Sequence, residues 1–105
     1  MGRLIFRGGV RVDFEDRTLT HLYNVILAKL RRGESLHFTW KDDLSAGDGR
    51  TTIWIHPGTS FVCKFSGPPV EVNPLWLDEL MTSAHSVSGL TITPEPPHPT
   101  PAGRD

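Results

Sequence analysis

The feature that most constrains the fold is one stripe of large apolar residues at helical spacing. Its members recur at positions i, i+3, i+4, i+7, i+8 and i+11, and they are Leu19, Leu22, Tyr23, Ile26, Leu27 and Leu30. Asp16 precedes the stripe as the expected N-cap, and Gly33 follows it as the expected C′ residue. The stripe therefore predicts an amphipathic helix with one buried face, which the rest of the chain must cover.

The segments around this helix change to the alternation of apolar and polar residues that is typical of β-strands. Val10, Val12 and Phe14 alternate with charged residues, and Gly8-Gly9 before them supplies the positive φ of a hairpin turn. The expected strands are residues 3–7, 10–15, 35–41, 50–56 and 60–66.

A second helix is expected after Asn73-Pro74, because asparagine is a good N-cap and proline is favoured at the first helical position. It should end near Ser88-Gly89, and residues 90–93 are expected to form one last short strand. The order ββαβββαβ predicts an α+β fold in which a mostly antiparallel sheet carries two helices on one face. A chain of 105 residues has the length of a single domain.

The composition changes abruptly after residue 93. Five of the nine prolines fall between residues 94 and 101, and proline lacks the backbone donor that helices and strands need. We therefore expect a folded domain over residues 1–93 and a proline-rich, polyproline-like tail without fixed structure over residues 94–105. Residues 1–93 hold ten basic and ten acidic residues, so the domain is formally neutral.

The sequence contains none of the usual catalytic or cofactor motifs. It has no GxxxxGK[ST] phosphate loop and no GxSxG nucleophile elbow. The five histidines are scattered, and His37 and His56, which adjacent strands could bring together, are too few for a closed metal site. Cys63 lies within a strand and is expected to act as a small hydrophobic residue. We therefore expect no enzymatic activity, no cofactor and no bound metal.

The single cysteine also bears on location. It cannot form an internal disulfide, which fits a reducing compartment. The sequence has no run of about 18 apolar residues, the length that a membrane span needs. We therefore expect a cytoplasmic location and no membrane partner.

The sheet face opposite the helices is the best candidate for a binding surface. If the apolar residues of each strand point inward, the outer face carries Arg11, His37, Thr39, Lys41, Thr52, Trp54, His56 and Lys64. A tryptophan among basic and hydroxyl side chains on an open sheet is typical of surfaces that stack bases or pack against a protein. The alternatives are that Trp54 covers a thin domain or is buried between two copies of the chain.

The last turn of the first helix carries a second group of candidates: Lys29, Arg31 and Arg32. Cations at this position complement the helix dipole by about 0.3–1 kcal/mol each, which favours a structural role. The same cations could instead contact phosphates. The formal neutrality of residues 1–93 argues against strong non-specific binding to nucleic acid, which typically needs a basic excess.

Several strings of the sequence resemble those of a family of small actinobacterial proteins that often carry the label ATP-dependent DNA ligase. The strings are Phe14-Glu15-Asp16-Arg17, Leu19-x-His21-Leu22, Lys29-Leu30-Arg31-Arg32-Gly33-Glu34, Phe38-x-Trp40, Gly49-Arg50-x-x-Ile53-Trp54-x-His56-Pro57, Phe65-x-Gly67 and Asn73-x-x-Trp76. The resemblance covers about residues 1–96.

The label itself implies no catalytic residue in this chain. Such ligases transfer a nucleotide through the lysine of a KxDG motif, and the nearest string here is Lys41-Asp42-Asp43-Leu44, with leucine in place of glycine. The resemblance therefore implies at most an association with DNA transactions.

Three hypotheses follow for the function. The first is a non-enzymatic module that binds a nucleic acid or a protein through the open sheet face. Its binding residues are Trp54, His56, His37 and Lys41, joined in the case of a nucleic acid by Lys29, Arg31 and Arg32. The second is an assembly protein in which the same face is buried in a homodimer. The third is an enzyme related to DNA ligases, which the altered motif disfavours.

Overall fold

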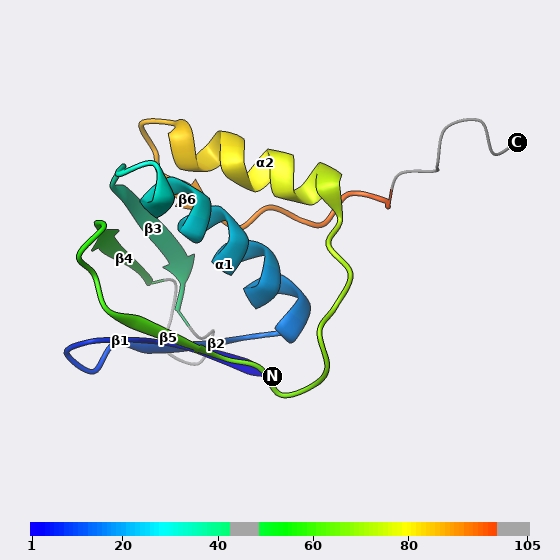
Figure 1. Ribbon diagram of the computed structural model, residues 1–105, viewed down its shortest axis with the longest axis horizontal. Helices are drawn as coiled ribbons and strands as arrows, with labels where there is room; N and C mark the ends of the chain where they lie inside the picture. Colours follow the sequence, from blue (N-terminus) through cyan, green and yellow to red (C-terminus); the bar gives the residue numbers. More distant parts are fainter. Residues whose placement is uncertain (43–48, 99–105) are drawn as a thin grey trace, which may run out of the picture.

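The computed structural model describes residues 1–42 and 49–98. Its elements follow the predicted order ββαβββαβ (Figure 1). They are β1 (Gly2–Phe6), β2 (Arg11–Phe14), α1 (Asp16–Arg31), β3 (Leu36–Lys41), β4 (Arg50–Ile55), β5 (Phe61–Lys64), α2 (Pro74–His85) and β6 (Leu90–Thr91). The predicted α+β class is confirmed. Asp43 and Leu44 of the string compared with the ligase motif, and residues 99–105 of the expected tail, lie outside the described residues.

The strands form two small sheets, whereas the sequence led us to expect one. Sheet A has the order β2-β1-β5, and sheet B has the order β4-β3-β6. All pairings are antiparallel except that of β3 with β6. The chain turns away from sheet B after β4, where the Thr59 N–H donates to the His56 carbonyl. The next strand then pairs with β1, and Cys63 lies opposite Leu4. The alternation of residues predicted each strand, but it could not say which strands pair.

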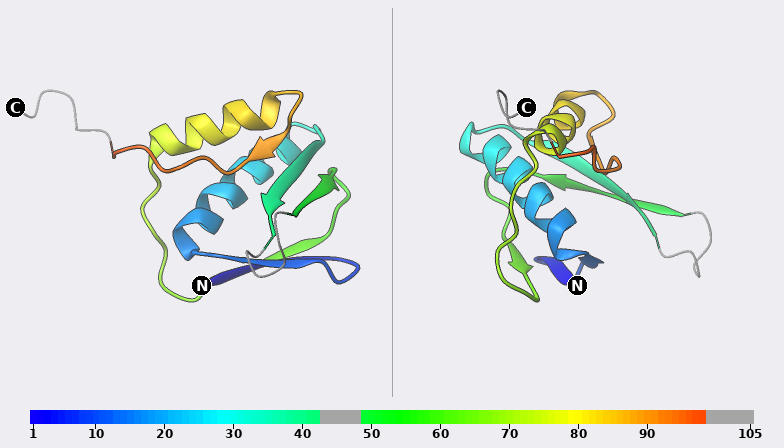
Figure 2. Two further views of the ribbon diagram at one scale, coloured as in Figure 1. Left: turned by 180° about the vertical axis from the view of Figure 1, so that it is seen from behind. Right: turned by 90° about the vertical axis from the view of Figure 1, so that its right-hand side faces the viewer.

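Helix α1 lies between sheet A and α2, and α2 packs against β6 and β3 (Figures 1 and 2). The apolar core fills the space between these layers. Its main members are Leu4, Phe6, Leu19, Leu22, Val25, Ile26, Leu36, Phe38, Ile55, Trp76, Leu80 and Leu90.

The buried arc of α1 differs slightly from the predicted stripe. Val25, which the stripe omits, is fully buried, whereas Tyr23 and Leu27 are only half-buried. The reason is that α1 packs on two sides, against sheet A and against α2, so its buried arc is not centred on the stripe.

Both helices are fixed at their starts by a side chain, but in different ways. Asn73 caps α2 as predicted, because its side-chain oxygen accepts a backbone N–H bond from the first turn at 3.1 Å. Asp16 is not the N-cap of α1, since Glu15 holds that position. The Asp16 carboxylate instead accepts backbone N–H bonds from Ser66 and Gly67 at 2.7–3.1 Å. These bonds lower the pKa of that carboxyl and tie α1 to the chain that follows β5.

Glycines with positive φ reverse the chain after each helix. Gly33 follows α1 with φ 74°, as predicted. Helix α2 ends at His85, earlier than the predicted end near Ser88-Gly89. The residues between His85 and β6 therefore form a turn, in which Gly89 has φ 81°.

Candidate functional site

The exposed side of strands β3 and β4 carries many of the predicted binding residues. Antiparallel pairing sets six side chains in three cross-strand rows: His37 with Trp54, Thr39 with Thr52, and Lys41 with Arg50. We call these six residues the β3–β4 outer face. In the right-hand view of Figure 2, the two strands run side by side away from the helices. The sequence prediction missed Arg50, although the alternation Arg50, Thr52, Trp54 already placed it on this face.

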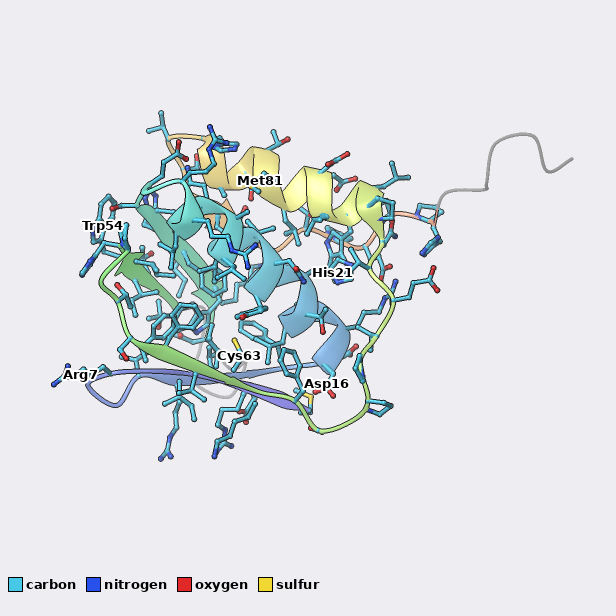
Figure 3. The ribbon with its side chains drawn as sticks, viewed as in Figure 1. Arg7, Asp16, His21, Trp54, Cys63 and Met81 are labelled. Carbon is cyan, nitrogen blue, oxygen red and sulfur yellow. The ribbon has the colours of Figure 1, made fainter. Side chains whose placement is uncertain are left out.

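Trp54 is the most exposed aromatic residue in the part of the chain that the structure describes. It is 60% exposed, whereas Trp40 and Trp76 are 8% and 4% exposed. Its indole stacks on the His37 ring, with centroids 6.3 Å apart and planes at 15°. Figure 3 shows Trp54 at the rim of the molecule. The indole lies beside a roughly parallel ring and leaves much of its surface open to another planar group.

The charge of the β3–β4 outer face is positive. Lys41 and Arg50 form its last row, and none of its six residues is acidic. Within residues 1–42 and 49–98, neither cation takes part in an ion pair. The neighbouring Asp42 carboxylate accepts a hydrogen bond from Thr51 at 2.7 Å. The outer face thus presents two cations side by side on neighbouring strands, a charge that attracts anionic ligands.

His56 lies beside Trp54, in the turn after β4. The ring Nδ1 of His56 accepts a hydrogen bond from the Gly58 N–H at 3.1 Å. The backbone N–H of His56 donates to the Thr59 hydroxyl at 2.9 Å. The ring is thus turned back onto its own turn. Together with Trp54 and Arg7 it lines a shallow hollow of about 290 Å³. The structure therefore brings Arg7 to the site, a residue to which the sequence assigned no role.

Two other cations of the expected outer face lie elsewhere. Arg11 and Lys64 belong to sheet A, where Arg11 lies opposite Ile5 and Lys64 lies opposite Arg3. Because the strands divide into two sheets, the expected eight-residue face does not form as one surface.

The basic end of α1 is largely occupied by internal contacts. Lys29 is only 7% exposed, and its ammonium lies 3.0 Å from a Glu34 carboxylate oxygen and 3.2 Å from His85 Nδ1. Arg32 also pairs with Glu34, at 3.4 Å. The ion pair with Lys29 lowers the pKa of Glu34. Lys29 therefore does not form an open cationic patch with Arg31 and Arg32, and the phosphate contacts expected of those two arginines stay a prediction.

A second polar cluster lies at the start of α2, with a buried centre and an ion pair at its edge. We call Arg17, His21, Asn73, Trp76 and Glu95 the α2 N-terminal network. His21 is fully buried; its Nδ1 donates to the Arg17 carbonyl at 2.7 Å, and its Nε2 accepts the Asn73 N–H at 2.9 Å. Its ring packs on Trp76 with centroids 4.6 Å apart, and the indole N–H donates to the Thr93 carbonyl. Every polar atom of these two rings has a partner within the protein, which indicates a structural role.

Residues 95 and 96 complete this network, although the sequence led us to expect a tail from residue 94. Arg17 forms a two-point ion pair with Glu95, with N–O distances of 2.6 and 2.5 Å. The Asn73 amide donates to Glu95 and to the Pro96 carbonyl at 3.0 and 2.9 Å. These bonds, chiefly those from Arg17, lower the pKa of Glu95 to about 2. The chain as far as Pro96 therefore lies against the domain.

The remaining candidates for chemistry do not gather into a site. Cys63 lies between sheet A and α1 (Figure 3), and burial raises the pKa of its thiol to about 11. A thiol with such a pKa is almost entirely protonated at neutral pH and is a poor nucleophile. Among the described residues, no three histidine, cysteine, aspartate or glutamate side chains come together as metal ligands would.

The fold and the outer face define a small α+β domain with an open aromatic and basic surface. Residues 1–95 match the family described as Domain of unknown function (DUF7882), and the chain belongs to that family. No curated protein and no solved structure matches the chain. The actinobacterial origin and the ligase label stay predictions. Neither helix of the described chain is long and apolar enough to cross a membrane.

Proposed function

We propose that this domain is a non-enzymatic module that binds single-stranded nucleic acid on the β3–β4 outer face. The observation that carries the proposal is the exposed Trp54 indole, stacked on His37, with two cations further along the same face. Base stacking on an aromatic side chain contributes about 1–3 kcal/mol per base and works with every base.

Lys41 and Arg50 supply the charges that backbone phosphates need. Arg50 lies four residues before Trp54 on β4, which corresponds to about 13 Å along a strand. When a base stacks on Trp54, the adjoining backbone can therefore run along the face toward both cations. Arg7 and His56 border Trp54 in the hollow beyond the end of β4, which gives the strand a second direction in which to continue.

The proposed partner is single-stranded because Trp54 needs the open face of a base, which a duplex keeps stacked. A duplex offers mainly phosphates to a flat sheet, and non-specific binding to phosphates needs a basic excess. This chain has a formal net charge of −1. Local contacts on the outer face therefore support the proposal, whereas the overall charge does not favour duplex binding.

The test is the fluorescence anisotropy of a dye-labelled oligothymidine titrated with wild type and with Trp54→Ala. We expect the variant to lose roughly 10- to 100-fold in affinity, since one stacked base is lost. Val62→Ala is the matched control, because Val62 is also an exposed apolar residue but belongs to sheet A. Equal affinities of Trp54→Ala and wild type would reject the proposal, as would the absence of wild-type binding at about 50 mM salt.

One observation favours a second candidate function, assembly as a homodimer. Strand β4 lies at the edge of sheet B, and an edge strand offers its outer backbone groups to another strand. A second copy paired along β4 would extend sheet B and place side chains of the partner strand next to Trp54, which would reduce the exposure of the indole. Light scattering distinguishes the two candidates. A measured mass equal to one chain supports the open binding face, whereas twice that mass together with a shielded Trp54 supports the dimer.

A further inference from the structure

Beside the β3–β4 outer face lies a hollow that three separate segments of the chain line. Its volume is about 460 Å³, and its lining residues are His37, Thr39, Arg50, Thr52, Ser88 and Thr91. Four of these residues belong to the outer face, and two come from the chain between α2 and the end of β6. The hollow is half open to solvent, so it has room for a small group held at the surface of the domain.

The described residues of this lining offer several hydrogen-bond donors and include no carboxylate. It contains four hydroxyls, one imidazole and one guanidinium. The Thr39 and Thr52 hydroxyls bond to each other at 2.8 Å. One of them donates to the other, so the second keeps its proton for an outside acceptor. A lining of this kind suits an oxyanion.

Arg50 is the cation of the hollow, and it differs from the paired arginines of this domain. Arg3 pairs with Asp13, and Arg17 pairs with Glu95. No such ion pair engages Arg50 among the residues that the structure describes. The planar guanidinium presents a fork of N–H donors that matches the geometry of a phosphate.

Gly89 explains how the turn after α2 comes to border the hollow. Its φ is 81°, and a Cβ at this position would lie 2.4 Å from the His37 ring and 2.6 Å from the His37 carbonyl oxygen. Only glycine allows so close an approach, which brings the neighbouring Ser88 to the lining. The His37 ring thus has Gly89 beside it and Trp54 stacked on it, so it joins the hollow to the stacking surface.

We infer that this hollow is a phosphate-binding subsite, an inference that rests on the proposed function. One base stacks on Trp54, and a nearby phosphate of the same strand binds the Arg50 guanidinium. Ser88 and Thr91 donate hydroxyl hydrogen bonds to the phosphate oxygens from the opposite side of the hollow. The ligand of this subsite is a phosphate group, either an internal phosphodiester or a terminal phosphomonoester.

The test uses inorganic phosphate as the probe, followed by backbone amide NMR of the full chain at constant ionic strength, with chloride as the reference anion. We expect saturable shifts at Arg50, Ser88 and Thr91 that Arg50→Gln abolishes. Arg11→Gln, which changes an exposed arginine on sheet A, is the matched control and should leave these shifts unchanged.

Oligothymidine binding gives a second readout, in which Arg50→Gln should weaken binding about tenfold. Ser88→Ala, a milder change in an exposed turn, should weaken it two- to threefold.

The outcomes separate this inference from the proposed function. Phosphate shifts in the hollow that persist in Trp54→Ala support the subsite, even if no oligonucleotide binds and the single-strand proposal fails. A different result would overturn the subsite and leave the single-strand proposal standing. In that case the protein binds oligonucleotide with equal affinities for the two arginine variants, and inorganic phosphate causes no shifts. If the subsite is present, a 5′-phosphorylated oligonucleotide that binds more tightly than its 5′-hydroxyl form identifies a terminal phosphomonoester. Equal affinities identify an internal phosphodiester.

Discussion

The α2 N-terminal network and the β3–β4 outer face both pair a histidine with a tryptophan beside an arginine, but they place these residues in opposite environments. His21 packs on Trp76 in the buried network, and His37 stacks on Trp54 at the surface. Arg17 is held by Glu95, whereas no described carboxylate pairs with Arg50. This comparison shows that residue type alone does not distinguish a stabilising cluster from a binding surface. The difference is whether the polar groups find partners within the chain.

The largest expected effect is on stability, in the buried network. His21→Ala removes a buried ring and leaves the Asn73 N–H without its acceptor, so we expect the free energy of unfolding to fall by about 3–4 kcal/mol. His37→Ala removes the corresponding ring of the outer face and should cost about 1 kcal/mol or less, because that ring is only half-buried. Urea unfolding followed by circular dichroism measures both. Equal losses would mean that the two rings serve the same structural purpose.

The next effect is on binding, at the outer face. Trp54→Phe keeps an aromatic face, and Trp54→Leu keeps only apolar bulk. We expect the phenylalanine variant to bind oligothymidine within a few-fold of wild type and the leucine variant to lose at least tenfold, since stacking needs a π-face. Anisotropy titrations at one fixed salt concentration compare them. If leucine binds as well as phenylalanine, the contact is hydrophobic packing and the stacking account is wrong.

A smaller effect concerns the paired and unpaired cations. Replacing both Lys41 and Arg50 by glutamine should reduce the slope of log affinity against log salt by about 1.4, because each phosphate contact on a single strand contributes about 0.7. Arg3→Gln should leave the slope unchanged, since Arg3 already pairs with Asp13 at 2.6 Å. Titrations between about 50 and 200 mM salt give the slopes. Identical slopes for the double variant and wild type would remove these two cations from the interface.

The smallest effect is a pH dependence at the exposed edge of the α2 N-terminal network. The folded-state pKa of Glu95 is lowered to about 2 by Arg17 and Asn73, so its ionised form stabilises the fold. This contribution is complete above the unfolded pKa of about 4.3 and disappears as the pH falls toward about 2. The stability difference between wild type and Glu95→Gln should therefore be constant from pH 7 to about 5 and shrink below that range. Urea unfolding at several pH values gives this difference; a difference that persists at pH 2 would contradict the assigned ion pair.

Much of the fold could be predicted from local sequence signals. The stripe around Leu22 and Ile26 predicted α1, and Asn73-Pro74 predicted the start of α2, because both signals depend only on neighbouring residues. The division into two sheets could not be predicted, since strand alternation shows which side a residue faces but not which strand lies beside it. Val25 was missed for a related reason: its burial depends on α1 packing against two elements at once.

The candidate site could be predicted in part. The alternation placed His37, Lys41 and Trp54 on one outer face, as the structure has them. The same reasoning could not foresee that Lys29 would be buried, because one of its partners, His85, is 56 residues away in the sequence. Ser88 and Thr91 likewise reach the hollow only through the parallel pairing of β6 with β3.

The measurement that tests the central claim most directly is a titration of the wild-type protein with single-stranded oligothymidine, followed by tryptophan fluorescence at about 50 and 200 mM salt. Trp54 is the exposed one of the three tryptophans, so a base that stacks on it should quench the emission. The account predicts saturable quenching that weakens at the higher salt concentration. Unchanged emission at both salt concentrations, from a protein shown to be folded, would contradict it and direct the search for a partner toward proteins.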